Sequence, residues 1–79
     1  MKYVFVNTTK RAMGNAYKVW DTLHNCYVVI LCECGIMGLH KALTSHGWHT
    51  NDIQHINNVE ADRLQREGVR FICIHEVNY

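Results

Sequence analysis

Residues 26–34, with the sequence CYVVILCEC, decide the fold. This stretch is an almost unbroken apolar run that leads into Gly35-Ile36-Met37-Gly38. A run this short and this rich in valine and isoleucine is typical of a strand that is buried on both faces. We therefore expect residues 26–33 to form the central strand of a sheet. Side chains two residues apart on a strand share a face, so Cys26, Cys32 and Cys34 are predicted to point to the same side.

Outward from this run, the patterns predict further strands. Residues 3–6 and 69–77 are short runs of β-branched and aromatic residues. Residues 16–33 have the pattern of a β-hairpin, with His24-Asn25 as its tight connection. Residues 48–56 fit either a loop or a short strand.

Two short helices are predicted between the strands. Three apolar residues fall on one helical face and are followed by Gly47 as a C-terminal cap: Ile36, Leu39 and Leu43. Asn57-x-x-Glu60 has the form of a capping box, and it opens a helix that Gly68 closes. The predicted fold is α+β, with a mostly antiparallel sheet of four or five strands and both helices packed on one face.

Size and composition limit the organisation of the chain. Its 79 residues can build one hydrophobic core but not two, so residues 1–79 are predicted to form a single domain. No segment approaches the roughly 20 apolar residues that span a bilayer. The apolar block near the N-terminus is too short for a signal peptide. We therefore expect a cytoplasmic protein whose thiols are reduced.

Cys32-x-Cys34 raises the question of a metal site, in which His40, His46 or His49 would complete a zinc ligand set. Structural zinc sites usually separate their paired cysteines by two to four residues, whereas one residue intervenes here. Cysteine is also among the most frequently buried residue types. We therefore expect the sulfurs to pack in the core and predict no metal and no cofactor. A small Cys/His metal-binding domain is kept as an alternative.

Catalytic groups are not evident in the sequence. Ser45 and His46 are direct neighbours, which seldom act together as nucleophile and base. Glu60 and Asp62 would point to different faces of a helix, so they do not form a carboxylate pair. The sequence therefore predicts that the protein is not an enzyme.

Trp48 lies among histidines, with His49 beside it and His55 a few residues on. An exposed tryptophan is a favoured anchor in protein interfaces. The local density of His40, His46, His49 and His55 around Trp48 is therefore a candidate recognition patch, with Trp48, His49 and His55 as its predicted contacts. The alternative is that Trp48 closes one end of a small core.

A second candidate surface is basic. Lys10 and Arg11 lie in a polar stretch, and Lys18 and Trp20 follow on a predicted strand. Cations beside an aromatic residue can hold phosphate and stack a base. However, the net charge of the whole chain is only +1, which predicts no strong general attraction to nucleic acid.

By elimination, the leading functional hypothesis is binding. We expect a small standalone protein that docks on a larger protein and modulates or inhibits it, and we expect it to be encoded by a phage or mobile element and to act on a host system. The predicted contacts are Lys10, Arg11, Lys18, Trp20, Trp48, His49 and His55. The alternative is a nucleic-acid-binding module that uses Lys10, Arg11 and Lys18. An exposed sheet edge offers a further route, to a partner or to a homodimer.

Overall fold

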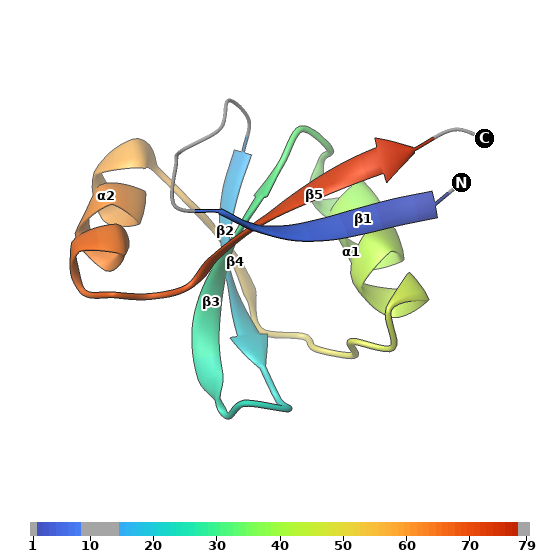
Figure 1. The fold of residues 1–79 in the computed structure, drawn as a ribbon, viewed down its shortest axis with the longest axis horizontal. Helices are drawn as coiled ribbons and strands as arrows, with labels where there is room; N and C mark the ends of the chain where they lie inside the picture. Colours follow the sequence, from blue (N-terminus) through green and yellow to red (C-terminus); the bar gives the residue numbers. More distant parts are fainter. Residues whose placement is uncertain (1, 9–14, 78–79) are drawn as a thin grey trace.

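The computed structural model describes residues 2–8 and 15–77 (Figure 1). In chain order its elements are β1 (Lys2–Thr8), β2 (Asn15–Asp21), β3 (Cys26–Cys32), α1 (Ile36–Ser45), β4 (Ile53–Ile56), α2 (Asn58–Arg66) and β5 (Phe71–Val77). The predicted α+β fold, with five strands and two helices, is confirmed. Over the described residues, neither helix is long and apolar enough to cross a membrane.

The five strands form one sheet in the order β1-β5-β3-β2-β4, which places β3 at the centre. All pairs are antiparallel except β3 with β5, so the sheet is mixed and mostly antiparallel, as predicted. Parallel neighbours need a long crossover connection. Here the chain from β3 to β5 supplies it and includes both helices and β4.

The predicted hairpin is β2 with β3, which pair along their whole length from Asn15↔Cys32 to Asp21↔Cys26. Its connection contains Asn25 at φ 55°, a left-handed conformation that asparagine tolerates better than most residues. The ambiguous segment 48–56 contains the short strand β4, which pairs with β2 on the side away from β3.

Two apolar clusters lie on opposite faces of β3. The first joins α1 to the face that carries Val28 and Ile30. The second joins α2 to the face that carries Val29 and Leu31. All four of these β3 side chains are at most 1% exposed, so the central strand is covered on both sides.

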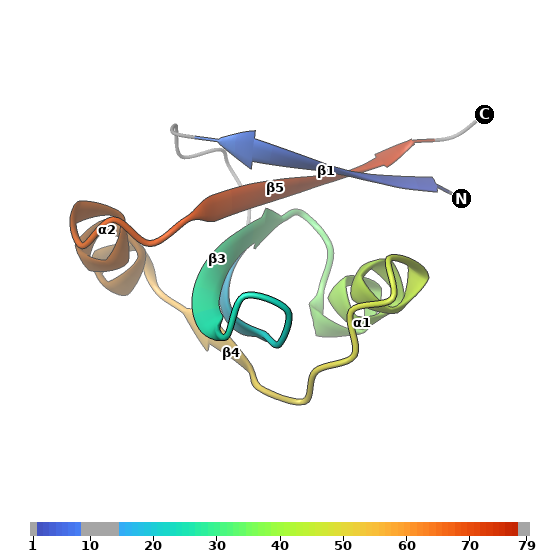
Figure 2. The ribbon, with the colours of Figure 1, turned by 60° about the horizontal axis from the view of Figure 1, so that its bottom comes forward.

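The prediction that both helices pack on one face of the sheet is therefore wrong. Figures 1 and 2 show α1 and α2 on opposite sides of the sheet, with β3 between them. The physical reason lies in the same apolar run that identified the strand. Consecutive apolar residues on a strand point to alternate faces, so an unbroken run has to be covered from both sides.

The helix ends follow the predicted signals. The Asn57 side chain accepts a hydrogen bond from the Glu60 amide at 2.8 Å, which confirms the cap of α2. Gly47 follows α1 at φ 76° and Gly68 follows α2 at φ 84°, the left-handed conformation in which glycine ends helices. After α1, the Trp48 amide also donates a hydrogen bond to the Leu43 carbonyl at 2.9 Å.

Cover on both faces predicts that two neighbouring β3 residues are equally costly to truncate. Ile30→Ala and Leu31→Ala should each lower the free energy of unfolding by about 2–5 kcal/mol, since each leaves a cavity against a different helix. Chemical denaturation measures both, with Leu23→Ala as the control because Leu23 is 84% exposed. A loss below about 1 kcal/mol for either β3 variant would mean that one face is open.

Candidate functional site

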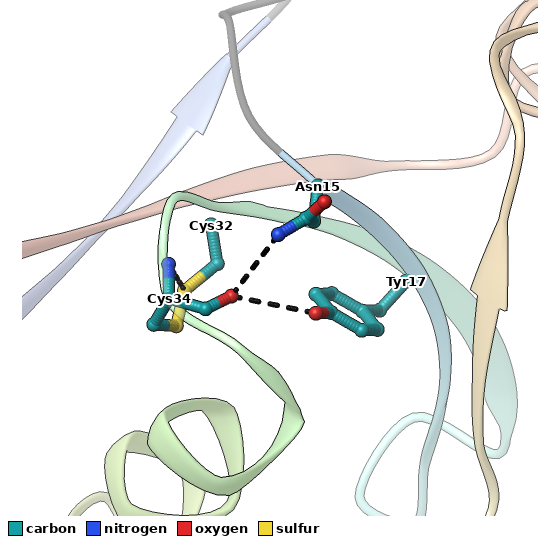
Figure 3. Close-up of a disulfide and its surroundings, with 4 residues drawn as sticks. All are labelled: Asn15, Tyr17, Cys32 and Cys34. Carbon is teal, nitrogen blue, oxygen red and sulfur yellow. Dashed lines mark hydrogen bonds between the residues drawn. A yellow bond between two sulfur atoms is a disulfide. The ribbon is translucent and has the colours of Figure 1, made fainter.

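A disulfide closes the turn between the central strand and the first helix. Cys32 is the last residue of β3, and α1 begins at Ile36. Within this turn Cys32 and Cys34 are joined by a disulfide (Figure 3). The backbone amide of Cys34 also donates a hydrogen bond to Sγ of Cys32 at 3.2 Å. The turn therefore gathers both sulfurs and one amide in a small space.

Strand β2 holds this turn in place from the side. The carbonyl oxygen of Cys34 accepts hydrogen bonds from the Tyr17 hydroxyl at 3.3 Å and from the Asn15 side-chain amide at 3.4 Å (Figure 3). Burial raises the pKa of Tyr17, so its hydroxyl keeps the proton that it donates at neutral pH. Because these two bonds reach the backbone and not the sulfurs, they do not depend on the disulfide.

The start of α1 is shaped around Cys34. A Cβ added to Gly38, in the first turn of the helix, would lie 2.7 Å from Cβ of Cys34. This is closer than carbon atoms approach without a shift of the backbone. Glycine at position 38 is what allows the Cys34 side chain to lie against the helix.

The structure corrects two predictions about the cysteines. The expectation of reduced thiols is wrong for Cys32 and Cys34, and Cys26 is exposed where a core position was predicted. The pairing arises because β3 ends at Cys32, so Cys34 leaves the regular alternation of the strand. Cys32 itself is buried in the α1-side cluster, as predicted. Cys73 is also buried.

The described part of the chain contains no set of side chains that could hold a metal ion. No group of three or more histidine, cysteine, aspartate or glutamate side chains is arranged there to hold an ion. The disulfide also occupies both sulfurs of Cys32-x-Cys34, which were the soft ligands of the metal-binding alternative.

A cleft lies beside the disulfide because β3 and β5 separate there. The two strands pair only from Val29↔Phe71 to Leu31↔Cys73, after which β5 continues alongside β1 alone. The space between them measures about 530 Å³. Its walls include both half-cystines, the thiol of Cys73, the imidazole of His75 and two carboxylates, Glu33 and Glu76.

The cleft contains two kinds of sulfur group, the Cys32–Cys34 disulfide and the Cys73 thiol, which differ in reactivity. Burial, and secondly the charge of Glu33, raise the pKa of the Cys73 thiol. Cys73 therefore stays protonated at neutral pH and is a poor nucleophile. Any sulfur chemistry in the cleft falls to the disulfide.

The basic candidate surface is present in part. Lys18 and Trp20 lie on the α2 side of β2, where both meet Tyr27 of β3. The Lys18 ammonium is 4.7 Å from the centre of the Tyr27 ring, and the Trp20 ring meets the same ring edge-on at 4.8 Å. Lys10 and Arg11 lie outside the described residues.

This basic and aromatic cluster is partly neutralised by carboxylates. The Tyr27 hydroxyl donates a hydrogen bond to Asp52, which raises the pKa of Tyr27. Lys18 is close enough to Glu60 of α2 to add to the lowering of its pKa, after the hydrogen bond from Arg63. The cluster is therefore not a simple cationic surface.

The three predicted contacts of the recognition patch have different environments. Trp48 is half-buried against the α1-side cluster, and its Nε1 donates to the Trp20 carbonyl at 3.0 Å. This position fits the alternative in which Trp48 closes the core. His49 is exposed. His55 is exposed on β4, where its ring meets Tyr17 edge-on at 5.2 Å.

The two outer strands of the sheet differ in length and protection. β4 has four residues, whereas β1 has seven and pairs only with β5. From Tyr3 to Thr8, β1 carries neither charge nor proline, and Val4 and Val6 are 43% and 45% exposed. Sheet edges are usually protected by charges, proline or bulges. β1 is therefore a long edge with no charge beyond Lys2. His46 covers part of it, with Nε2 3.3 Å from the Tyr3 carbonyl oxygen and its ring 3.8 Å from that of Phe5.

The sequence pattern does not predict the buried carboxylate of Asp21 at the end of β2. Asp21 is 5% exposed and accepts hydrogen bonds from the Leu23 amide at 2.9 Å, from His24 at 2.7 Å and from Arg70 at 3.2 Å. Burial by itself would raise the pKa of Asp21, but the hydrogen bonds, that from His24 first, outweigh it and lower the pKa. The cluster ties the β2–β3 turn to the start of β5.

Asp21 should make stability depend on acid pH. Because its pKa is lower folded than unfolded, it stabilises the fold above the ordinary aspartate value of about 3.9, and this contribution is lost as the pH falls through the folded value. We expect Asp21→Asn to reduce the free energy of unfolding by about 1–3 kcal/mol at neutral pH. Urea denaturation across pH should show that difference closing as the pH falls below the ordinary aspartate value. A difference that is unchanged with pH would contradict the assignment.

No family model, no curated protein and no solved structure matches this chain. Function therefore has to be inferred from the side chains and backbone groups that the fold exposes. The outer strand β1 and the disulfide cleft are the two features that offer specific chemistry to another molecule.

Proposed function

We propose that this protein binds a larger protein by accepting a strand of that partner at the free edge of β1, and that docking modulates or inhibits the partner. The observation that carries the proposal is the seven-residue outer strand with two exposed valines and no charge beyond Lys2. This is a proposal of a binding protein and not of an enzyme.

Backbone hydrogen bonding supports this mode of docking. One side of β1 pairs with β5 from Lys2↔Val77 to Thr8↔Phe71, and no other strand of residues 2–8 and 15–77 lies along its other side. One backbone group of β1, the Tyr3 carbonyl oxygen, already lies 3.3 Å from His46 Nε2. An extended segment of another protein can pair with backbone groups on that side by continuing the sheet. A seven-residue edge is long enough for a regular ladder.

Side chains on both faces of β1 would give such docking its specificity. Val4 and Val6 project to the α2 side of the sheet and are exposed there. Tyr3 and Phe5 project to the α1 side, where they are half-buried against the core cluster. An added strand with apolar residues at alternate positions would therefore find apolar neighbours above and below the sheet.

The proposal is tested by placing charge on the edge. Val4→Lys with Val6→Lys should lower partner retention at least about tenfold in capture from a lysate of the native host, since edge lysines oppose strand addition. The matched control is Leu23→Lys with Met37→Lys, two exposed apolar residues on other elements, which should retain the same partner. Thermal melting checks that both variants fold.

Three outcomes would overturn the proposal. These are equal retention by the edge variant, equal loss by the control, and the absence of any host protein that the unaltered chain captures reproducibly. If size-exclusion chromatography shows that the edge variant abolishes a dimer and nothing else, β1 binds a second copy and not a host protein.

Nucleic-acid binding is a second candidate function, favoured by the convergence of Lys18, Trp20 and Tyr27 on one face. A cation and a ring on a sheet can contact phosphate and stack a base. We expect single-stranded RNA to be retained less as salt rises, with a logarithmic slope of roughly −0.7 per phosphate contact. Lys18→Ala should reduce that slope by about one contact, whereas Lys41→Ala, on α1, should not. Salt-independent retention, or none, rejects this candidate.

A further inference from the structure

The two sulfurs of the disulfide are unequally accessible. Both cysteines pack against the α1-side cluster and line the cleft, but Cys32 is 4% exposed whereas Cys34 is half-buried. Thiol–disulfide exchange requires an incoming thiolate to reach one sulfur directly. Because Cys34 is the more exposed of the two residues, its Sγ is the sulfur that an incoming thiolate reaches more readily.

The other sulfur is placed as a leaving group. When Cys34 is attacked, the bond between the two sulfurs breaks and Cys32 departs as a thiolate. The Cys34 amide already donates to Sγ of Cys32 at 3.2 Å. Since a hydrogen bond to an ionised acceptor is stronger than one to a neutral acceptor, this amide stabilises the thiolate that forms.

The disulfide is also poorly suited to a purely structural role. A single residue, Glu33, separates its two cysteines. In the chain-entropy account, a disulfide stabilises less as its loop becomes shorter, so this one contributes little to the fold. The bonds from Tyr17 and Asn15 to the Cys34 carbonyl keep the turn in place without it. Reduction therefore leaves the site assembled.

The adjacent cleft has room for a substrate. Its volume of about 530 Å³ falls within the range of roughly 300–1,000 Å³ typical of ligand pockets. One wall is formed by β5 beyond Cys73, where the strand no longer pairs with β3. Backbone groups along this wall suit an extended segment of polypeptide. Cys73, which also lines the cleft, is buried and does not compete as a nucleophile.

We propose that the Cys32–Cys34 disulfide is a thiol–disulfide exchange site that accepts cysteinyl thiols entering the cleft between β3 and β5. This inference goes beyond the proposed docking function, because it needs no strand docked on β1 and no bound protein partner.

The exchange proceeds in two balanced steps. A substrate thiolate attacks Cys34 Sγ, which forms a mixed disulfide and releases Cys32 as a thiolate. A second substrate thiolate then attacks the substrate sulfur of the mixed disulfide, which forms the substrate disulfide and releases Cys34. Two electrons pass from the substrate thiols to the protein, which ends as a dithiol, and oxidised glutathione returns it to the disulfide.

The test uses the full chain with Cys26→Ser throughout, because Cys26 is an exposed thiol away from the cleft. The oxidised protein is mixed with either reduced glutathione or an unstructured peptide that carries two cysteines. Acid quenching, alkylation and intact-mass measurement then follow the protein dithiol. We expect the dithiol peptide to reduce the protein disulfide at least about tenfold faster than it reduces oxidised glutathione, a reference disulfide, at equal concentration. A faster peptide reaction assigns polypeptide substrates, and equal rates assign small thiols.

Single-cysteine variants locate the reactive sulfur. Treated with oxidised glutathione, Cys32→Ser should trap a mixed disulfide at Cys34, whereas Cys34→Ser should accumulate at least about tenfold less at Cys32. Thermal melting confirms that each variant folds.

Three results would overturn the inference. They are four free thiols in the unreduced wild-type protein, exchange no faster than that of oxidised glutathione, and equal labelling of the two variants. Cysteine variants that lose exchange but still capture the partner, or a β1 edge variant that loses capture but still exchanges, show that the two sites are separate.

Discussion

The burial of β3 on both faces is the constraint on which the rest of the structure depends. The side chains from Val28 to Cys32 are buried without interruption, and they alternate between the α1-side and α2-side clusters. Two helices on opposite faces are the means by which so short a chain covers this strand. The same requirement leaves β1 and β4 at the edges, because the central positions of the sheet belong to β3 and its two neighbours.

The site grows from the end of that strand. β3 stops pairing with β5 at Leu31, and the chain turns at Glu33 toward α1. The turn brings Cys34 back to Cys32, and the separation from β5 opens the cleft beside them. A disulfide and a cleft thus arise at one place because a fully buried strand ends there.

Local patterns in the sequence predict much of this fold. The apolar run marks β3, the alternation of β2 marks the hairpin, and Asn57, Gly47 and Gly68 mark helix ends, since each signal depends on residues close in sequence. The unbroken apolar run of β3 implies that both faces of the sheet are covered. The helix patterns do not show this, because they indicate which side of a helix is apolar and not the face of the sheet on which the helix packs.

The features that sequence interpretation missed depend on distant residues. The hydrogen bonds around Asp21 include one from Arg70 of a remote segment. The β1 edge is visible only once the strand order is known, because Val4 and Val6 resemble core residues in the sequence. The disulfide depends on where β3 ends, which the continuous pattern CYVVILCEC does not mark.

The two proposed sites share a structural element. β5 pairs with β1 on one side and forms the cleft wall on the other, and Tyr3 of β1 also lines the cleft. A strand added to β1 would extend the part of the sheet, β1 and β5, that lines the cleft beside the disulfide. Docking and thiol exchange are thus separate in chemistry but adjacent in space.

Amide hydrogen exchange of the native protein, followed residue by residue by NMR, tests the central claim most directly. If β3 is enclosed by both helices, the amides of Val29, Ile30 and Leu31 exchange only through global unfolding, at least about a thousandfold slower than unprotected amides. The outer-strand amides of β1 should exchange well before them. Amides of β3 that exchange as rapidly as those of β1 would contradict the account.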